Sequence, residues 1–286
     1  MIRPCISALF LLVLALSIPR TAHAETYNTC SGFITSLPVL IATQGTWCLK
    51  SDLATAITAG NAITINTNNV TIDCNGFKIG DLAAGVSTVA IGIYSLSHAN
   101  ATIRHCNIRG FYTGVLLGGI GSGALVEDNR LDNNTYIGIE VDGDSSIIRN
   151  NRVFDTGGST ASVDAHGINA AYSVDVQDNV VAGVTATSGG NGSAFGIVTT
   201  VDASGSVSGN RVRDVIKDGT GIAYGIFNAS SGHLDLRDNF LVGDGSTGSV
   251  GLLCSNSNGS ARDNTIDGFD TALQACTDSG GNVTIP

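Results

Sequence analysis

A short phrase of apolar and polar residues recurs along most of the chain. It consists of an apolar residue, two variable residues, an asparagine, one variable residue and a second apolar residue, as in VEDNRL at 126–131. Eight copies lie 22 to 31 residues apart, and their asparagine position is occupied by Asn75, Cys106, Asn129, Asn151, Asn179, Asn210, Asn239 and Asn264. A glycine followed by Ile, Val or Leu lies between consecutive copies. Repeats of this length indicate stacked units, because one unit alone cannot bury its apolar face.

The apolar positions of successive repeats align into three columns. One lies three residues before the asparagine, one lies two residues after it, and one follows the glycine. In parallel coils about 4.8 Å apart, each column forms an inward ladder. An asparagine suits the corner because it tolerates the left-handed region and its amide can bond to the coils above and below. A two-sheet sandwich predicts antiparallel hairpins at near-even spacing instead. The pattern predicts an all-β, single-stranded parallel β-helix, a solenoid of about eight coils, over residues 60–286, after an N-terminal lead-in or cap at 25–59.

The first 24 residues are typical of a secretory signal peptide. Arg3 precedes an apolar run from Phe10 to Ile18, and Ala22-His23-Ala24 forms a cleavage site of the small-x-small kind. The apolar run is too short to span a membrane, so we expect a secreted or periplasmic protein without a membrane span. Removing this segment leaves twice as many acidic as basic side chains, which disfavours nucleic acid as a partner.

Six cysteines remain after the signal peptide, in a compartment that permits disulfides. Two fall at nearly the same corner of consecutive coils, and two follow corresponding strands of the last two coils. This register leaves the remaining two to pair in the lead-in. Free buried thiols are the alternative. The coil register favours three disulfides, Cys30–Cys48, Cys74–Cys106 and Cys254–Cys276.

The repeats resemble those of right-handed parallel β-helix proteins of the pectin-lyase-like superfamily, in particular its secreted bacterial members. The resemblance covers about residues 60–275 and is carried by coils such as NVTIDCNGFKIG at 69–80 and ATIRHCNIRGFYTGV at 101–115. The segment LIATQGTWCLKSDL at 40–53 resembles the lead-in strand of such proteins. The resemblance implies a right-handed solenoid. Lyases, hydrolases, epimerases and adhesins share this fold, so the resemblance by itself assigns no reaction.

The repeats contain a candidate site. In the strand after the third glycine, Glu140 and Asp142 point to one face, about 7 Å apart. Asn169 is expected to stack on Glu140 from the next coil, with Asp164 and His166 just upstream. Loops inserted on one face of a repeat protein are typical of a binding face. Here the insertions leave four successive coils at one corner and predict a groove beside coils 3 to 6, at 155–166, 183–195, 214–224 and 243–250.

This constellation suits several kinds of chemistry. Two carboxylates at that separation fit the acid and base of an inverting glycosidase, or oxygen ligands of Ca²⁺; a solvated acidic face is the structural alternative. His166 beside Asp164 is a candidate acid or base, or else a half-buried corner histidine. The resemblance adds Arg213 and Lys217 as candidate substrate-binding residues, because lyases of the superfamily use a basic residue near bound Ca²⁺. No pectate-lyase motif and no polygalacturonase motif occurs, and Ala165 replaces the proline of the epimerase motif Asp-Pro-His.

We therefore expect an exported β-helix protein that binds or processes polysaccharide. The sequence leaves open whether it is an enzyme, in which case a polysaccharide lyase or glycoside hydrolase is expected. The only cofactor that the sequence suggests is Ca²⁺. The alternative is a non-catalytic adhesin or tailspike-like module, which predicts inert Glu140 and Asp142 and allows a homo-oligomer.

Overall fold

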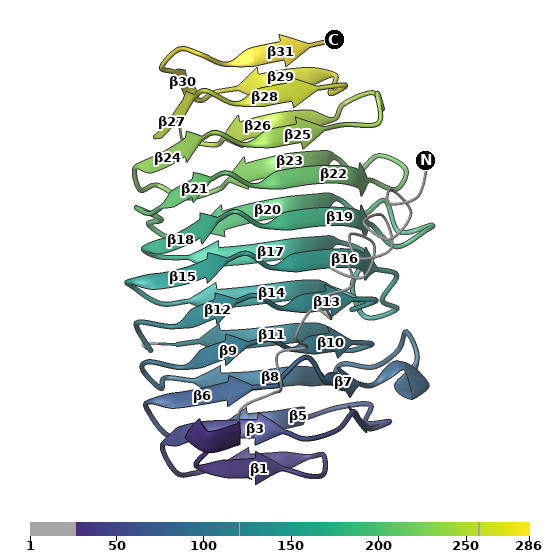
Figure 1. The fold of residues 1–286 in the computed structure, drawn as a ribbon. Coiled ribbons are helices and arrows are strands. Elements are labelled where there is room, and N and C mark those ends of the chain that lie inside the picture. Colours follow the sequence, from purple (N-terminus) through teal and green to yellow (C-terminus); the bar gives the residue numbers. More distant parts are fainter. Residues whose placement is uncertain (1–26, 120, 257) are drawn as a thin grey trace, which may run out of the picture.

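The computed structural model describes residues 27–119, 121–256 and 258–286, and these form a rod of stacked coils (Figure 1). The predicted signal peptide lies outside the described residues. The rod is a right-handed parallel β-solenoid of about 9 turns. The predicted fold class is confirmed, with about one turn more than expected. Within the described residues, no helix is both long and apolar enough to cross a lipid bilayer.

Three parallel sheets surround the core, and the strands of successive turns alternate among them. Sheet A contains β1 (Gly32–Ile34), β3 (Gly45–Leu49), β6 (Val70–Asp73), β9 (Thr102–Arg104), β12 (Leu125–Glu127), β15 (Ser146–Arg149), β18 (Val174–Gln177), β21 (Ser206–Ser208), β24 (Leu234–Arg237), β27 (Gly259–Arg262) and β30 (Thr277–Asp278). Sheet B contains β2 (Val39–Ile41), β5 (Asn61–Ile65), β8 (Ile91–Leu96), β11 (Thr113–Gly118), β14 (Ile137–Asp142), β17 (Ala165–Ala171), β20 (Ala194–Thr200), β23 (Ala223–Asn228), β26 (Val250–Cys254) and β29 (Thr271–Gln274). Sheet C contains β4 (Leu53–Ala54), β7 (Lys78–Gly80), β10 (Asn107–Arg109), β13 (Arg130–Asp132), β16 (Arg152–Gly157), β19 (Val180–Thr185), β22 (Arg211–Ile216), β25 (Phe240–Val242), β28 (Thr265–Asp267) and β31 (Val283–Ile285). Two short 3-10 helices, η1 (Tyr27–Thr29) and η2 (Leu82–Ala84), lie outside the sheets. The residues expected to form a lead-in contribute β1 to β4 to these same sheets.

The three apolar columns form the core as predicted. In sheet B, Ile139 is in register with Val115 of the preceding turn and Ile168 of the next, and all three are buried. Equivalent ladders of Ile, Val and Leu line the inner faces of sheets A and C. Each turn therefore buries its apolar residues only by stacking on its neighbours.

The turn of residues 70–80 departs from the predicted register. Asn75 and Phe77 were expected in the asparagine and apolar columns, but Cys74 and Ile79 take those places, since Ile79 pairs with Ile108. The reason is an insertion: five positions separate the paired residues Asp73 and Lys78 of this turn, against three in the next turn. Asn75 adopts φ of 50° in the extra length.

The remaining asparagines form a continuous buried column between sheets A and C. In each turn the amide Nδ2 donates to Oδ1 of the next asparagine, as from Asn179 to Asn210 at 3.0 Å, and to a backbone carbonyl. This confirms the predicted amide ladder and extends it to Asn282. The expected left-handed backbone lies one residue earlier than predicted, at positions such as Asp178 with φ of 55°. The exposed residue makes the bend, which leaves the buried amide free to bond along the rod.

All three predicted disulfides are present, namely Cys30–Cys48, Cys74–Cys106 and Cys254–Cys276. Cys74–Cys106 joins two consecutive turns at the start of the asparagine column, where the Cys106 N–H donates to Oδ1 of Asn129, the first asparagine of the column. Cys254–Cys276 joins the end of β26 in sheet B to the segment between β29 and β30. The bridges lie toward the two ends of the solenoid, where strands lack a neighbour on one side.

Candidate functional site

The outer face of sheet B carries the predicted acidic constellation. Glu140 of β14 is in register with Leu116 of the preceding turn and with Asn169 of the next. Asp142, two residues further along β14, is in register with Ala171. The side chains of Glu140 and Asn169 are in contact, as counting from the glycines predicts.

Glu140 is a half-buried carboxyl group with few polar neighbours. Asn169 Nδ2 donates a hydrogen bond to Glu140 Oε1 at 3.2 Å. Burial, and then repulsion from Asp142, raises the pKa of Glu140 to about 7, although the bond from Asn169 opposes the change. Burial also raises the pKa of Asp142. Glu140 therefore retains a proton in part of the molecules at neutral pH, which is the state that a general acid requires.

A ladder of rings runs along the edge of sheet B where the chain enters it, formed by Tyr112, Tyr136, His166, Phe195 and Tyr224. Neighbouring ring centroids lie 4.7, 5.3, 4.7 and 5.1 Å apart. Such contacts are favourable between aromatic rings. Three of the four contacts are stacked, so the ladder directs mainly ring edges, and not ring faces, toward solvent.

His166 is a neutral member of this ladder. Burial lowers the pKa of His166 to about 4, and the charge of Asp164 opposes this only in part. Asp164 is itself engaged, because its Oδ1 accepts the N–H of Ser193 at 2.7 Å. Within the described residues, His166 Nδ1 and Asn169 Oδ1 are buried without a hydrogen-bond partner. Buried polar atoms are normally paired, so these two atoms, three residues apart on β17, suit a ligand that supplies the missing groups.

Loops between sheets C and B project from one side of the rod beside these residues (Figure 1). Loop 158–164 precedes β17 and loop 186–193 precedes β20. They are joined by Thr187 Oγ1, which donates to the carbonyl oxygens of Ser159 and Ser162 at 2.9 and 3.0 Å. The two inserted loops thus support each other.

A hollow of about 410 Å³ adjoins Asp142 at the other edge of sheet B. Asp144 and Tyr172 also line it, together with three glycines and a serine. Tyr172 is 42% exposed and has φ of 66°, a conformation that bulky residues rarely adopt. Carboxylates beside an exposed ring suit a ligand rich in hydroxyl groups. Among the described residues, no three or more His, Cys, Asp or Glu side chains gather as a metal site.

Neither of the two basic residues expected near the site lies on a strand of sheet B. Arg213 belongs to β22 of sheet C and forms an ion pair with Asp214. Lys217 follows the same strand, and its Nζ donates to the carbonyl oxygen of Gly219 at 2.9 Å. In the described part of the chain, neither makes a hydrogen bond or ion pair with Glu140.

Sequence reasoning missed the tyrosines of the ring ladder. Tyr112 and Tyr136 stand two residues before the glycine of their turn, whereas His166 stands one residue before its own. A fixed offset therefore does not align them. Ser162 of the inserted loop lies close enough to both tyrosines to affect their pKa values, and no local pattern predicts this proximity between segments.

Comparison with known proteins assigns the family. The family model described as "Right handed beta helix region" matches residues 54–196, and the chain belongs to this family. A search of curated protein sequences finds no match.

Several solved structures are similar in fold. The A-module of mannuronan C-5 epimerase AlgE6 from Azotobacter vinelandii is 15% identical with a TM-score of 0.52, over 90% of this chain and 79% of that one. The Agl-KA catalytic domain is 12% identical with a TM-score of 0.47, over 90% of this chain and 58% of that one. A tailspike protein of the E. coli bacteriophage HK620 is 12% identical with a TM-score of 0.48, over 88% and 58% of the two chains.

Proposed function

We propose that this protein is exported and binds a polysaccharide across the outer face of sheet B. The polysaccharide lies beside the loops that precede β17, β20 and β23, and Glu140 is the residue that donates a proton to it. The observation that carries the proposal is Glu140 itself. It is a half-buried carboxyl group with a pKa of about 7, next to a second carboxylate and in contact with Asn169, whose buried Oδ1 has no hydrogen-bond partner among the described residues. The epimerase and tailspike structures that resemble this chain support a polysaccharide-related role in general.

The charge of sheet B indicates the class of polysaccharide. Across its ten described strands there is no Lys or Arg, and Glu140 and Asp142 are its acidic residues. A uronic acid polymer would bring carboxylates against these two carboxylates without a cation to offset them. A neutral polysaccharide instead offers hydroxyl groups, which can donate to Asp142 and to Asn169 Oδ1. We therefore favour a neutral substrate.

The arrangement suits hydrolysis with inversion. Alternate residues of one strand stand about 7 Å apart, and inverting glycosidases place their acid and base about 6.5–9.5 Å apart to accommodate a water molecule. Protonated Glu140 would protonate the glycosidic oxygen, and the Asp142 carboxylate would take a proton from the attacking water. The C–O bond to the leaving sugar breaks as the bond to water forms.

The test uses the full exported chain with its disulfides intact. Binding is measured by affinity electrophoresis on neutral polysaccharides and on pectate and alginate, and cleavage by reducing-sugar release and by the absorbance of unsaturated products. We expect binding to a neutral polymer, and Glu140→Gln should retain binding while losing cleavage by about 10²–10⁴-fold. Asp155→Asn, which removes an exposed carboxylate on sheet C, is the control and should behave as wild type. Absence of binding and cleavage across the panel would reject the proposal in favour of a non-catalytic structural module.

A further inference from the structure

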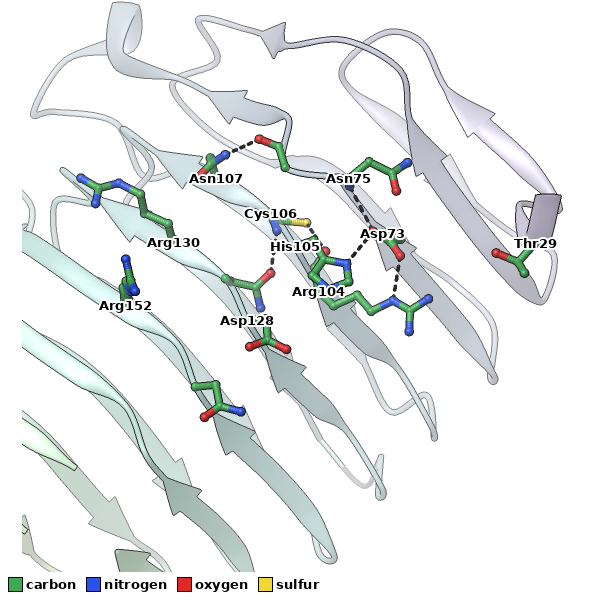
Figure 2. Close-up of a pocket in the computed structure, with 13 residues that line it drawn as sticks. Thr29, Asp73, Asn75, Arg104, His105, Cys106, Asn107, Asp128, Arg130 and Arg152 are labelled. Carbon is green, nitrogen blue, oxygen red and sulfur yellow. Dashed lines mark hydrogen bonds and ion pairs between the residues drawn. The ribbon is translucent and has the colours of Figure 1, made fainter. Parts of the chain in front are cut away.

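A second concave surface lies at the corner between sheets A and C, and sheet B takes no part in it (Figure 2). Its volume is about 850 Å³, and it extends over four successive turns. Its basic and acidic lining residues are Arg104, His105, Arg130, Arg152, Asp73 and Asp128. We call this surface the arginine furrow.

Two of the furrow arginines are held by carboxylates through Nε. Arg104 Nε donates to Asp73 Oδ2 at 2.8 Å, and Arg130 Nε donates to Asp132 Oδ2 at 2.9 Å. Burial raises the pKa of Asp73, but hydrogen bonds from the Asn75 N–H and His105 and the charge of Arg104 outweigh it, so the net change is downward. The terminal Nη groups of both arginines make no hydrogen bond within the described residues. A guanidinium group oriented in this way is suited to bind a carboxylate or sulfate.

Arg130 and Arg152 are cross-strand neighbours on sheet C, and both are exposed (Figure 2). Like charges directly opposite on adjacent strands are destabilising. Asp132 offsets the charge of Arg130 while it also pairs with Arg109. Arg152 has no ion pair or hydrogen bond in the described part of the chain. An anion held between Arg130 and Arg152 would remove the repulsion.

The positive charge continues along the rod beyond the furrow. The strands of sheet C carry six cations, Lys78, Arg109, Arg130, Arg152, Arg211 and Arg213. The same described strands carry four carboxylates, Asp132, Asp155, Asp214 and Asp267. Sheet C is thus a cationic strip in a chain that has more acidic than basic residues overall. Arg211 occupies the column of Arg130 and Arg152, two turns beyond Arg152.

We infer that the arginine furrow binds an acidic polysaccharide lying along the rod axis, separately from the glycan proposed at sheet B. A linear chain with recurring carboxylate or sulfate groups meets Arg130, Arg152 and Arg211 in turn, at spacings of one and two turns. Its hydroxyl groups can donate to the carboxylate of Asp128 and to Asn107 Oδ1, which also line the furrow, whereas Asn107 Nδ2 already donates to the carbonyl oxygen of Gly76. Asp128 repels any polyanion, and it disfavours a DNA duplex most, because a duplex carries one phosphate charge per about 1.7 Å of its axis.

The experiment measures retention of the full, disulfide-bonded chain on immobilised polygalacturonate, dextran sulfate and neutral dextran, and its affinity for a short DNA duplex, over a salt series. We expect binding to one or both acidic polymers and none to dextran; the two polymers distinguish carboxylate from sulfate. Arg152→Gln breaks no ion pair and should weaken binding several-fold. Arg130→Gln with Arg152→Gln should lower the magnitude of the slope of log affinity against log salt by about two.

The matched control also removes two positive charges, but from sheet A in the C-terminal part of the rod. Arg237→Gln with Arg262→Gln takes away two arginines that share Asp235 and should leave binding unchanged. Equal weakening by the two double variants, no retention of the wild type on either acidic polymer, or tighter binding to DNA would each overturn the inference. Glu140→Gln should leave retention on acidic polymers intact, so failure at sheet B and failure at the furrow are separable.

Discussion

A half-buried carboxyl group on a sheet resists ionisation, and at Glu140 this affects the stability of the fold. In the unfolded chain its pKa is near the ordinary value of 4.5, whereas in the folded chain burial raises it to about 7. The stability that protonated Glu140 contributes is therefore fully present below about pH 4.5 and is lost as the pH rises through 7. Because ionisation of Glu140 destabilises the folded chain near neutral pH, a chemical role is a reason for a carboxyl group at this position.

Glu140→Gln should remove that loss. As the pH rises from about 5 to about 8, the free energy of unfolding of the variant should increase relative to that of wild type by about 1–3 kcal/mol. Solvent screening of the half-buried carboxyl group sets the lower figure. Urea unfolding at both pH values measures this difference. Asp155→Asn should show no such change with pH, and parallel behaviour of wild type and Glu140→Gln would contradict the assigned burial.

His166 titrates with the opposite sign. Its pKa falls from an ordinary 6.5 to about 4 in the folded chain, so the stability it contributes is present above pH 6.5 and is lost as the pH falls through 4. His166→Phe continues the ring ladder beside Phe195 and removes a buried nitrogen without a partner. We expect a gain of about 1–2 kcal/mol near pH 5 and less near pH 8, measured by urea unfolding. If glycan binding at sheet B is also lost, His166 contributes to the site; a gain independent of pH would contradict the shifted pKa.

At the scale of the element, the asparagine column connects the turns through a buried chain of amides. Asn179 Oδ1 accepts from both the backbone N–H and the Nδ2 of Asn151, and its own Nδ2 donates to Ile148 O and Asn210 Oδ1. Each amide thus satisfies polar groups of the turns on both sides. The column acts as one cooperative element, since removal of one member leaves buried donors unpaired.

Asn179→Ala should therefore destabilise the solenoid by about 2–5 kcal/mol, because the buried N–H of Asn151 loses its acceptor. Asn282→Ala, at the partly exposed end of the column, should cost less than about 1 kcal/mol, because water replaces the lost bonds. Urea unfolding followed by circular dichroism compares the two variants. Similar losses at both positions would show that the column is not cooperative.

The repeat made most of the fold predictable, and part of the site with it. The register of Glu140 with Asn169 follows from counting residues after the glycine, since alternation and stacking are rigid. The register of the turn at Cys74 was predicted wrongly, because a two-residue insertion there leaves the sequence phrase intact but shifts the strand pairing. The arginine furrow was not predicted, because Arg104 and Arg152 belong to different sheets and line one surface only in the folded chain.

At the scale of the whole molecule, charge is divided among the three sheets. The described strands of sheet B contain acidic residues and no Lys or Arg, whereas the strands of sheet C contain more cations than carboxylates. Because the sheets face different directions around the rod, two ligands of different charge can bind at once without contact. The proposed neutral glycan and acidic polysaccharide thus require no rearrangement of the solenoid.

A rod of stacked turns also opens from its ends, because each turn contacts only its neighbours. In the described chain, β29, β30 and β31 each pair on one side only, and Val283 and Ile285 of β31 are exposed. Cys254–Cys276 closes a loop across this end with a sequence separation of 22 residues, which corresponds to a contribution of about 3 kcal/mol. Replacing both cysteines by alanine should therefore speed amide exchange in residues 271–285 by up to about 100-fold. Exchange near β5 and β6 at the opposite end should stay unchanged in the same hydrogen-exchange mass spectrometry experiment. Uniformly faster exchange along the rod would instead mean that the solenoid unfolds as one unit.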